Sequence, residues 1–407
     1  VSRTRGMYKQ LMSELFVRMV PQQFQKNERL LTLSELLDAT GFSKTMHEEI
    51  KAELKAGRIG LARNRLPVSV KITDPQSEEV IRAVSSRPEV EKRAGEEALR
   101  KRELAIVTLA GGVGSRWSQG AGIVKALHPF YRFSGTHRNF LDVHLAKNRK
   151  ISREYGEPGQ HVFTTSYLTH SAMAQYLAST GSGEKDGLFL SPGRFVGLRL
   201  HPMERDLRFY WNEMSHQVLD QQKQKMAENL QNTLINWTRQ MGEGDDYTDN
   251  EPEQCIHPVG HWFEIPNLLL NGTLQRMLRQ NPNLRYLMVH NVDTLGATAD
   301  PAMLGLHLAS GHHMTVEVIS RWMDDRGGGL ARVNGLLRLV EGLALPDEEA
   351  EFNLSYYNTN TFWITVDELL RVFGLSRNDL DNPSLVTAGI LEMSRSMPSY
   401  ITIKEVK

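Results

Sequence analysis

The strongest constraint on the fold of this chain is a short apolar run that ends in a cluster of glycines. Residues 105–109 read Ala-Ile-Val-Thr-Leu, and Gly111, Gly112 and Gly114 follow almost at once. An apolar run of this length bounded by glycine is typical of a buried strand. Glycine costs about 0.5–1 kcal/mol relative to alanine inside a regular element, so the cluster is expected where the backbone turns tightly or meets a ligand closely. The two candidates are a plain turn and a bound phosphate.

Strand-like and helical segments alternate along the rest of the chain. Further strands are predicted over residues 160–165, 284–290 and 314–320. Helices are predicted over residues 218–241, 266–280 and 301–310. Such alternation favours an α/β unit with a largely parallel sheet, and ligands bind at the carboxyl ends of the strands in such sheets.

The first hundred residues are expected to be helical. Apolar positions at helical spacing predict helices over residues 30–39 and 46–56, with Thr32 and Ser34 as possible caps of the first. Residues 91–103 are dense in charges of both signs, which is typical of a solvated helix face or a linker.

Composition excludes several classes of partner. The 407 residues include 48 Lys and Arg and 48 Asp and Glu, so no global field attracts nucleic acid or an anionic membrane. Apolar runs are shorter than the ~18 residues of a membrane-spanning helix. The single cysteine, Cys255, excludes an internal disulfide and is interpreted as a core or loop residue rather than a nucleophile. The sequence indicates no particular oligomeric state.

Two groups of polar residues are considered as metal ligands, and both are interpreted as surface residues. Residues 242–253 are acidic and are interpreted as a surface loop, although three of their carboxylates could hold a metal ion: Asp245, Asp246 and Asp249. Three histidines lack a carboxylate or cysteine partner at ligand spacing and are interpreted as surface residues: His307, His312 and His313.

The glycine cluster does not fit the two best-known phosphate-binding motifs. Gly-Lys-Ser/Thr does not follow it, and Trp117 stands where the dinucleotide fingerprint requires its third glycine, which disfavours an NAD-dependent oxidoreductase. Backbone amides in such a loop can still point at phosphate oxygens. Arg116 and Lys125 would then neutralise the phosphate charge.

Asp293 follows directly after the predicted strand over residues 284–290. A carboxylate at this edge of the sheet can hold Mg²⁺ against phosphate oxygens. The alternatives are a cap for the helix that begins at Pro301 and an ordinary turn residue.

The order of a strand, Gly-Gly-Val-Gly-Ser-Arg, a spacer and a lysine resembles the signature of sugar-nucleotide pyrophosphorylases. Later segments resemble the UDP-glucose pyrophosphorylase family in particular and occur in that family's order, at residues 257–266, 291–297, 317–329 and 357–364. The resemblance runs from about Leu104 to the C-terminus. Two longer stretches, residues 110–130 and 191–209, are most similar to a plastid-type branch associated with sulfolipid synthesis, which also has bacterial relatives.

The resemblance implies an α/β fold with a Rossmann-like (GT-A-like) nucleotidyltransferase core and a mixed, mostly parallel sheet. This core is expected over residues 101–395, between a helical region at 1–100 and the start of a C-terminal β-rich region at 396–407. The implied reaction joins UTP to a sugar 1-phosphate, foremost glucose 1-phosphate, with Mg²⁺ as cofactor and pyrophosphate as second product. Nucleic acid and membranes are not implied partners, and the implied compartment is a bacterial cytoplasm or a plant plastid stroma.

The resemblance also assigns roles to individual residues. Catalytic roles fall on Arg116, Lys125 and Lys404, and the metal role on Asp293. Nucleotide and substrate binding falls on Leu109, Gly111, Gly112, Gly114, Ser115, His170, Gly260, His261, Asn291, Gly328, Asn358 and Asn360. The alternatives are a turn histidine at His261, turn asparagines at Asn358 and Asn360, and an exposed edge-strand lysine at Lys404.

The chain departs from the family pattern at four points. Two extra residues lengthen the loop before Lys125, Val124 replaces a proline, and Arg321 stands where relatives carry lysine. The glutamine that reads the uracil edge has no counterpart in residues 189–193. These departures motivate a second hypothesis, in which the protein is a nucleotide-binding regulator that kept the fold and lost catalysis.

Overall fold

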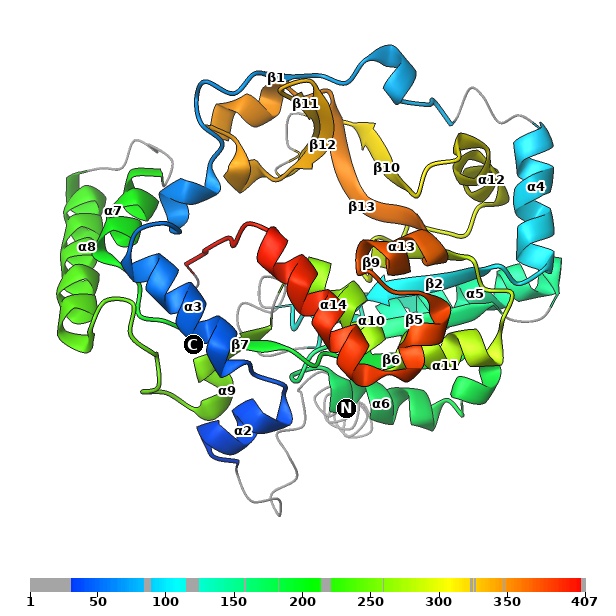
Figure 1. The fold of residues 1–407 in the computed structure, drawn as a ribbon, viewed down its shortest axis with the longest axis horizontal. Coiled ribbons are helices and arrows are strands. Elements are labelled where there is room, and N and C mark those ends of the chain that lie inside the picture. Colours follow the sequence, from blue (N-terminus) through cyan, green and yellow to red (C-terminus); the bar gives the residue numbers. More distant parts are fainter. Residues whose placement is uncertain are drawn as a thin grey trace, which may run out of the picture.

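The computed structural model describes residues 31–83, 89–114, 124–156, 159–181, 183–213, 221–258, 260–322, 325, 327–346 and 348–403. In this part of the chain, a nine-stranded mixed sheet forms the centre, with the strand order β1-β11-β13-β9-β2-β5-β6 (Figure 1). Strands β10 and β12 lie off this path and pair with β13 and β11. The α/β fold with a mixed sheet is therefore confirmed.

Four neighbouring strands of the sheet run parallel: β2 (Leu104–Leu109), β5 (Gln160–Thr165), β6 (Leu188–Pro192) and β9 (Tyr286–Asn291). Every residue of β2 and β5 is buried, as expected for strands covered on both faces. The prediction for β5 is confirmed residue for residue, and β2 and β9 lie within two residues of their predicted bounds.

Antiparallel strands extend the sheet beyond β9. The long strand β13 (Tyr356–Thr365) pairs with β10 (Met314–Ser320) on one side. On its other side it pairs with β9 through residues 362–365 and with β11 (Gly329–Val333) at Tyr357. The outer strands β12 (Leu336–Val340) and β1 (Ile72–Thr73) both pair with β11. Two small sheets pair β3 (Tyr131–Phe133) with β4 (Thr136–Arg138) and β7 (Val196–Leu198) with β8 (Ile256–Pro258).

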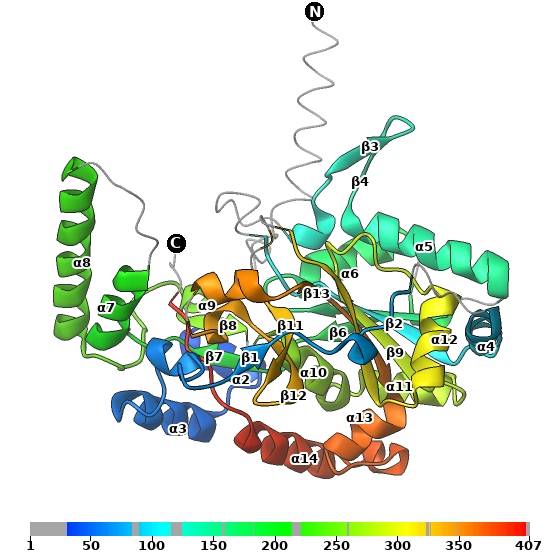
Figure 2. The same cartoon turned by 90° about the horizontal axis from the view of Figure 1, so that it is seen from above.

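Helices cover both faces of the sheet (Figure 2). One face packs against α10 (Glu264–Leu270), α11 (Thr273–Gln280), α13 (Val366–Val372) and α14 (Pro383–Ser396). The other face packs against α5 (Phe140–Tyr155), α6 (His170–Ser179), α4 (Glu89–Arg100) and α12 (Pro301–Ser310). Side chains alternate between the two cores, so that Val162 of β5 joins the first core and Phe163 the second.

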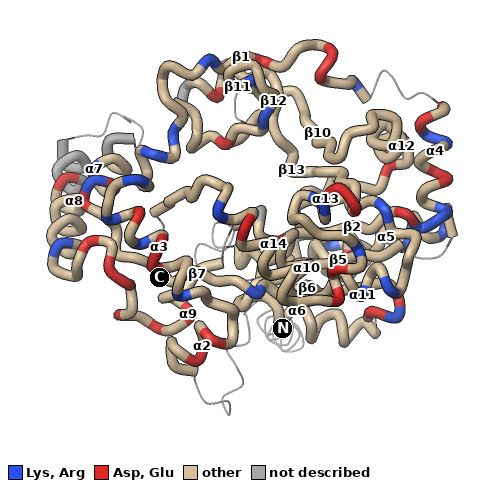
Figure 3. Tube along the Cα trace, in the orientation of Figure 1, with Lys and Arg blue, Asp and Glu red and all other residues tan. Residues whose placement is uncertain are grey.

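Helix α4 packs closely against α12, although its segment reads as a solvated face or a linker. A Cβ on Gly95 would lie 1.8 Å from the carbonyl oxygen of Pro301, and one on Gly305 would lie 1.8 Å from that of Glu91. Glycine at both positions allows the two backbones to meet. Residues of both charge signs are spread along α4 (Figure 3), and an ion pair joins Arg100 to Glu96 on this helix. The solvated helix face predicted for residues 91–103 is therefore present, but the opposite face of the helix packs against α12.

The first described residues form α2 (Leu33–Ala39) and α3 (Lys44–Lys55), close to the predicted helices. Thr32 caps α2 as predicted, and its hydroxyl accepts a hydrogen bond from the amide of Glu35. Residues 72–73 then enter the central sheet as β1, so the N-terminal hundred residues contribute a strand as well as helices. The domain boundaries at residues 100 and 395 stay a prediction.

The remaining helices are α7 (Glu204–Glu213), α8 (Gln221–Met241) and α9 (Pro252–Cys255). Short 3₁₀ helices are η1 (Leu61–Asn64), η2 (Ser77–Glu79), η3 (Lys125–Leu127), η4 (Glu184–Asp186), η5 (His261–Phe263), η6 (Gly342–Ala344), η7 (Glu348–Asn353) and η8 (Arg377–Asp381). The single helix predicted over residues 266–280 is wrong: it divides into α10 and α11 because Gly272 adopts a left-handed φ of 70°. Among the described helices, none has the length and apolar character needed to cross a membrane.

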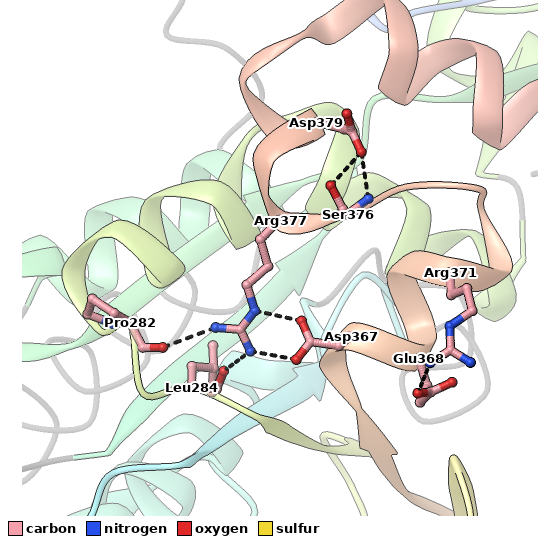
Figure 4. Close-up of polar contacts among 8 residues, drawn as sticks. All are labelled: Pro282, Leu284, Asp367, Glu368, Arg371, Ser376, Arg377 and Asp379. Carbon is pink, nitrogen blue, oxygen red and sulfur yellow. Dashed lines mark hydrogen bonds and ion pairs between the residues drawn. The ribbon is translucent and has the colours of Figure 1, made fainter.

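At the amino end of β9, one arginine fixes the chain that enters the strand (Figure 4). The Arg377 guanidinium donates to both carboxylate oxygens of Asp367, at 2.6 and 3.0 Å. It also donates to the carbonyl oxygens of Pro282 at 3.0 Å and Leu284 at 2.7 Å. The entry to β9 is thereby tied to α13.

Candidate functional site

The carboxyl ends of the parallel strands bring several of the predicted residues together. Leu109 ends β2 and pairs in register with Asn291, which ends β9. On its other side, Leu109 pairs with Thr164 of β5. The segments that leave β2 and β9 therefore begin side by side, at the edge where ligands bind in α/β sheets.

The glycine corner, Gly111–Gly114, leaves β2 at this edge. Gly114 has a left-handed φ of 73°, which favours glycine. A Cβ on Gly111 would lie 3.0 Å from Oε1 of Glu264, whereas a Cβ on Gly112 would meet nothing within 4 Å among the described residues. The hydroxyl of Ser166 donates to the Gly111 carbonyl at 2.7 Å. The corner is thus tightly packed at Gly111 and open at Gly112. Ser115 and Arg116, the next predicted residues, lie outside the described part of the chain.

Lys125 and Asp293, which are 168 residues apart, form an ion pair between Nζ and Oδ2. Lys125 begins η3, next to the fully buried Val124, and Asp293 lies in the turn after β9. Their side chains are 19% and 35% exposed, so both remain within reach of solvent. The structure therefore places the predicted catalytic cation against the predicted metal ligand.

Asp293 does not cap α12. That role belongs to Asp300, whose Oδ1 accepts a hydrogen bond of 2.7 Å from the amide of Ala302. The backbone carbonyl of Asp293 accepts a hydrogen bond from the amide of Leu295 at 2.8 Å, so the residue does shape a turn. Its carboxylate, in contrast, points to Lys125.

A β-bulge in β13 carries the predicted asparagines to the same edge. The register of β10 against β13 shifts between Glu317 and Val318, and Asn360 takes a left-handed φ of 57°. Its side-chain amide donates to Oδ1 of Asn291 at 2.8 Å, and its backbone amide donates to Oδ1 of Asn358 at 2.9 Å. The amide of Asn358 donates in turn to the Gly328 carbonyl at 3.2 Å. These four predicted residues therefore form one hydrogen-bonded row, and the bulge excludes a simple turn.

His170 opens α6, and its Nδ1 lies 2.8 Å from the hydroxyl of Thr165, the last residue of β5. Burial lowers the pKa of His170, and the nearby Arg194 lowers it further. The imidazole is consequently neutral at pH 7. Gly260 has a positive φ of 33° and precedes η5, where His261 is exposed.

Sequence reasoning missed Glu264, which links the Gly260–His261 segment to the glycine corner. Its Oε1 faces Gly111, and its buried Oε2 has no hydrogen-bond partner among the described residues. Burial raises the pKa of this carboxyl to about 7, against the opposing effect of a hydrogen bond from Thr164. Its nearness to the predicted Gly260–His261 pair was the available signal, but the sequence gives no sign of its burial.

Several other predictions concern residues away from this edge. Cys255 is buried, as expected, whereas His307 is only 2% exposed and not a surface residue. It lies between Thr315 and Thr365, with ring nitrogens 3.0 and 3.3 Å from their hydroxyls, because α12 buries most of its surface between α4 and the sheet. His312 and His313 are exposed, as predicted.

The acidic loop after α8 binds cations of the protein itself. Asp245 pairs with Lys55 at 2.6 Å, and Asp246 pairs with Lys51 at 3.0 Å and lies 2.9 Å from His47 Nε2. These contacts fix α3 to the loop, so the loop is less solvated than its sequence suggests. Because Lys51 already neutralises Asp246, the arrangement favours ion pairs over a metal site.

The remaining predicted residues have structural contacts or lie outside the described residues. The Arg321 guanidinium donates to three backbone carbonyls, those of Asp325, Gly327 and Gly328, and so shapes the loop before β11. Lys404 lies outside the described residues; nearby, the amide of Ile401 donates to Oδ1 of Asn64 at 3.1 Å.

Comparisons with known proteins find similarity to one family of enzymes. Residues 225–395 match the family model for UTP–glucose-1-phosphate uridylyltransferase. A probable UTP–glucose-1-phosphate uridylyltransferase of Schizosaccharomyces pombe is 30% identical over 165 residues, which are 37% of this chain and 33% of that protein. The corresponding enzyme of Saccharomyces cerevisiae is 28% identical over 138 residues, covering 32% of this chain and 27% of the enzyme. The matched region thus spans about a third of these relatives.

Solved structures match a larger part of the chain and show the fold. UDP-glucose phosphorylase from Trypanosoma brucei aligns with a TM-score of 0.57 at 17% identity, covering 84% of this chain and 63% of that one. A point variant of UDP-glucose pyrophosphorylase from Leishmania major, solved in complex with UDP-glucose, aligns with a TM-score of 0.53 at 19% identity, with 82% and 65% covered.

Proposed function

We propose that this protein is a uridylyltransferase of the UDP-glucose pyrophosphorylase family. The family model and the curated relatives support this proposal. The protein joins UTP to a sugar 1-phosphate, foremost glucose 1-phosphate, and releases pyrophosphate. The observation that carries the proposal is the Lys125–Asp293 ion pair beside the glycine corner. The pair places a cation and a carboxylate at the sheet edge where a nucleotide binds.

The reaction needs no nucleophile from the protein. An oxygen of the sugar 1-phosphate attacks the α-phosphorus of UTP, and the bond from that phosphorus to the bridging oxygen breaks as pyrophosphate leaves. Two anions must therefore be brought together, and positioning alone can supply about 7–11 kcal/mol of barrier reduction. The glycine corner offers backbone amides to the triphosphate, and Lys125 stabilises charge that develops in the transition state. Asn358 and Asn360 offer amide groups to the sugar hydroxyls.

The residues present fit a magnesium ion. Mg²⁺ prefers oxygen ligands and is typically held by one or two carboxylates together with substrate phosphates. Asp293 provides one carboxylate, 35% exposed, in the turn after β9, which begins beside the end of β2. When bound, Mg²⁺ would supply charge neutralisation to the phosphates. Asp293 would hold it, and Lys125 would be released toward the nucleotide.

The finer assignments belong to the same proposal. A place in sulfolipid synthesis and location in a bacterial cytoplasm or a plastid stroma are supported by the sequence resemblance alone. The curated relatives described above come from yeasts. They give no support to the sulfolipid branch.

A pyrophosphate-release assay tests the proposal. Purified protein is incubated with Mg²⁺ and each of a panel of nucleoside triphosphates and sugar 1-phosphates. We expect release with UTP and glucose 1-phosphate, and little release when the nucleotide or the sugar phosphate is omitted. Saturable UDP-glucose binding without pyrophosphate release from any pair would instead support the regulatory protein that has lost catalysis.

A further inference from the structure

Helix α5 turns a polar pair of side chains toward the turn that carries Asp293. His144 and Lys147 are three residues apart and therefore lie on the same face of the helix. Both contact the segment Val292–Ala297, which follows β9. Neither residue belongs to the site described above, and the proposed reaction does not use either of them.

The His144 contact fixes the start of this turn. Its Nε2 donates to the Val292 carbonyl at 2.7 Å, directly before Asp293. Because a carbonyl oxygen only accepts, the histidine carries its proton on Nε2. His144 is 2% exposed, and burial lowers its pKa to about 4, so this neutral donor persists at pH 7.

The Lys147 contact fixes the end of the turn. Its ammonium group donates to the Leu295 carbonyl and, at 2.7 Å, to the Ala297 carbonyl. Among the described residues, Lys147 has no carboxylate within ion-pair distance, and burial lowers its pKa. Removing an ammonium group from water costs free energy, and its hydrogen bonds to the Leu295 and Ala297 carbonyls offset part of that cost.

Val292 and Ala297 pack into the hydrophobic cores, but within the described residues the backbone hydrogen bonds of the turn include only one to the sheet. The Val292 amide donates to the Leu109 carbonyl at 3.0 Å. The next backbone hydrogen bonds stay within the turn, from Thr294 to Asn291, from Leu295 to Asp293 and from Ala297 to Thr294. The two α5 side chains therefore anchor the turn on both sides of Asp293.

We infer that His144 and Lys147 are positioning residues that hold the Asp293 carboxylate in place for the transfer reaction, an inference that rests on the proposed function. Neither residue touches substrate. Their effect passes through three backbone carbonyls, those of Val292, Leu295 and Ala297. Partners of this kind, one step removed from a reacting group, typically change activity roughly 10- to 100-fold when they are removed.

The test compares Lys147→Met with the matched control Lys150→Met, which lies on an exposed part of the same helix. Hydrogen–deuterium exchange is followed in peptides that cover residues 292–297, and pyrophosphate release is measured in parallel. For Lys147→Met, we expect faster exchange in this turn and a kcat roughly 10- to 100-fold lower, with little change in the KM for UTP. Lys150→Met should match the parent protein in both measurements.

Two variants at His144 separate positioning from packing. His144→Gln retains an N–H donor near the Val292 carbonyl, whereas His144→Leu keeps the volume and removes the donor. We expect Gln to retain most of the kcat and Leu to lose it, with faster exchange at residues 292–297. These variants also serve if Lys147→Met does not fold.

The outcomes distinguish this inference from the proposed function. An active parent protein whose kcat is unchanged in Lys147→Met and His144→Leu would overturn the inference and leave the function standing. Exchange that rises equally in the Lys150→Met control would also overturn it. A parent protein that releases no pyrophosphate would overturn the proposed function. In that case the exchange measurement still tests the anchoring by α5, which unchanged exchange at residues 292–297 in Lys147→Met and His144→Leu would overturn.

Discussion

The two ends of strand β9 use their polar groups in opposite ways. At the amino end, the Arg377 guanidinium satisfies Asp367 and two backbone carbonyls (Figure 4). At the carboxyl end, Asp293 and Lys125 form an ion pair in which both side chains remain partly exposed. Both pairs are partly exposed: the side chains of Arg377 and Asp367 are 31% and 56% exposed, and those of Lys125 and Asp293 are 19% and 35% exposed. The two ends differ in what the pairs hold: Arg377 binds the backbone that enters β9, whereas Lys125 and Asp293 lie at the edge where ligands bind in α/β sheets. Mutations at the amino end of β9 should therefore lower stability, and mutations at its carboxyl end should lower turnover.

Lys125→Ala should have the largest effect, and it should fall on turnover rather than on stability. Removing one group that stabilises transition-state charge typically lowers kcat by about 10²–10³-fold. The lost ion pair is partly exposed, so the unfolding free energy should change by less than about 1 kcal/mol. Pyrophosphate release and thermal unfolding of the variant measure the two effects. Parental turnover in a folded variant would remove Lys125 from the site.

Glu264, which packs against the glycine corner, should make the stability of the protein depend on pH. Burial raises its pKa from 4.5 to about 7, so the folded protein holds this proton more tightly than the unfolded chain does. Its contribution to stability is therefore fully present below about pH 4.5 and is lost as the pH rises through about 7. Relative to Glu264→Gln, the parent protein should lose at most about 3 kcal/mol over this range, at 1.36 kcal/mol per pKa unit.

Urea unfolding of both proteins between pH 4.5 and 8 checks this expectation. The buried histidines titrate in both proteins, so the difference between the two curves isolates Glu264. A difference that stays constant with pH would show that the carboxyl has its ordinary pKa in the folded state.

Arg377→Met should affect stability and spare turnover. Two backbone carbonyls and Asp367 lose a charged donor, which is expected to lower the unfolding free energy by about 1–3 kcal/mol. Activity at low temperature should stay within about twofold of the parent. The control is Arg371→Met, whose pair with Glu368 lies nearby on the surface and is 69% exposed at the arginine. That control should change stability by at most about 1 kcal/mol.

Asn360→Gly should have the smallest effect of the four. Glycine accepts the left-handed φ of 57° without strain, so the bulge should survive. The variant loses one amide and its hydrogen bond to Asn291, worth about 1 kcal/mol. We expect the KM for the sugar phosphate to rise several-fold, as steady-state kinetics would show. An unchanged KM would leave Asn360 with a structural role only.

The sequence predicts the parallel half of the molecule well. Strands β2 and β5 are buried on both faces, and their bounds are found within a residue. Strand β2 reads as an almost continuous apolar run, whereas β5 has apolar and β-branched residues at 162–165. Helix α12 is also found residue for residue, because Pro301 begins it and Gly311 ends it. Local chemistry specifies each of these elements.

In the antiparallel half, the strand predicted over residues 314–320 is confirmed residue for residue as β10, whereas β13 was not predicted as a strand because it depends on partners distant in the chain. Strand β13 carries Asn358, Thr359 and Asn360, which suggest a turn, and only its pairing with β10 and β9 makes the segment a bulged strand. Glu264 and His307 were missed or misplaced for the same reason. Their burial comes from residues packed against them in the fold, and single-sequence patterns do not report it.

The candidate site was predicted chiefly from sequence motifs. Physical reasoning could assess each motif separately, but it could not show that the motifs lie together in space. Spacing alone leaves Asp293 as a metal ligand, a cap or a turn residue. The fold excludes the cap, which belongs to Asp300, and it brings Lys125 to the Asp293 carboxylate. The metal ion and the roles of the individual site residues remain predictions.

The most direct test of the central claim is a crystal structure of the protein with UDP-glucose and Mg²⁺. We expect the diphosphate to lie against the glycine corner, within contact distance of Lys125, and the metal ion to be bound by the Asp293 carboxylate. UDP-glucose bound elsewhere, with Lys125 and Asp293 still paired and the glycine corner empty, would contradict this expectation.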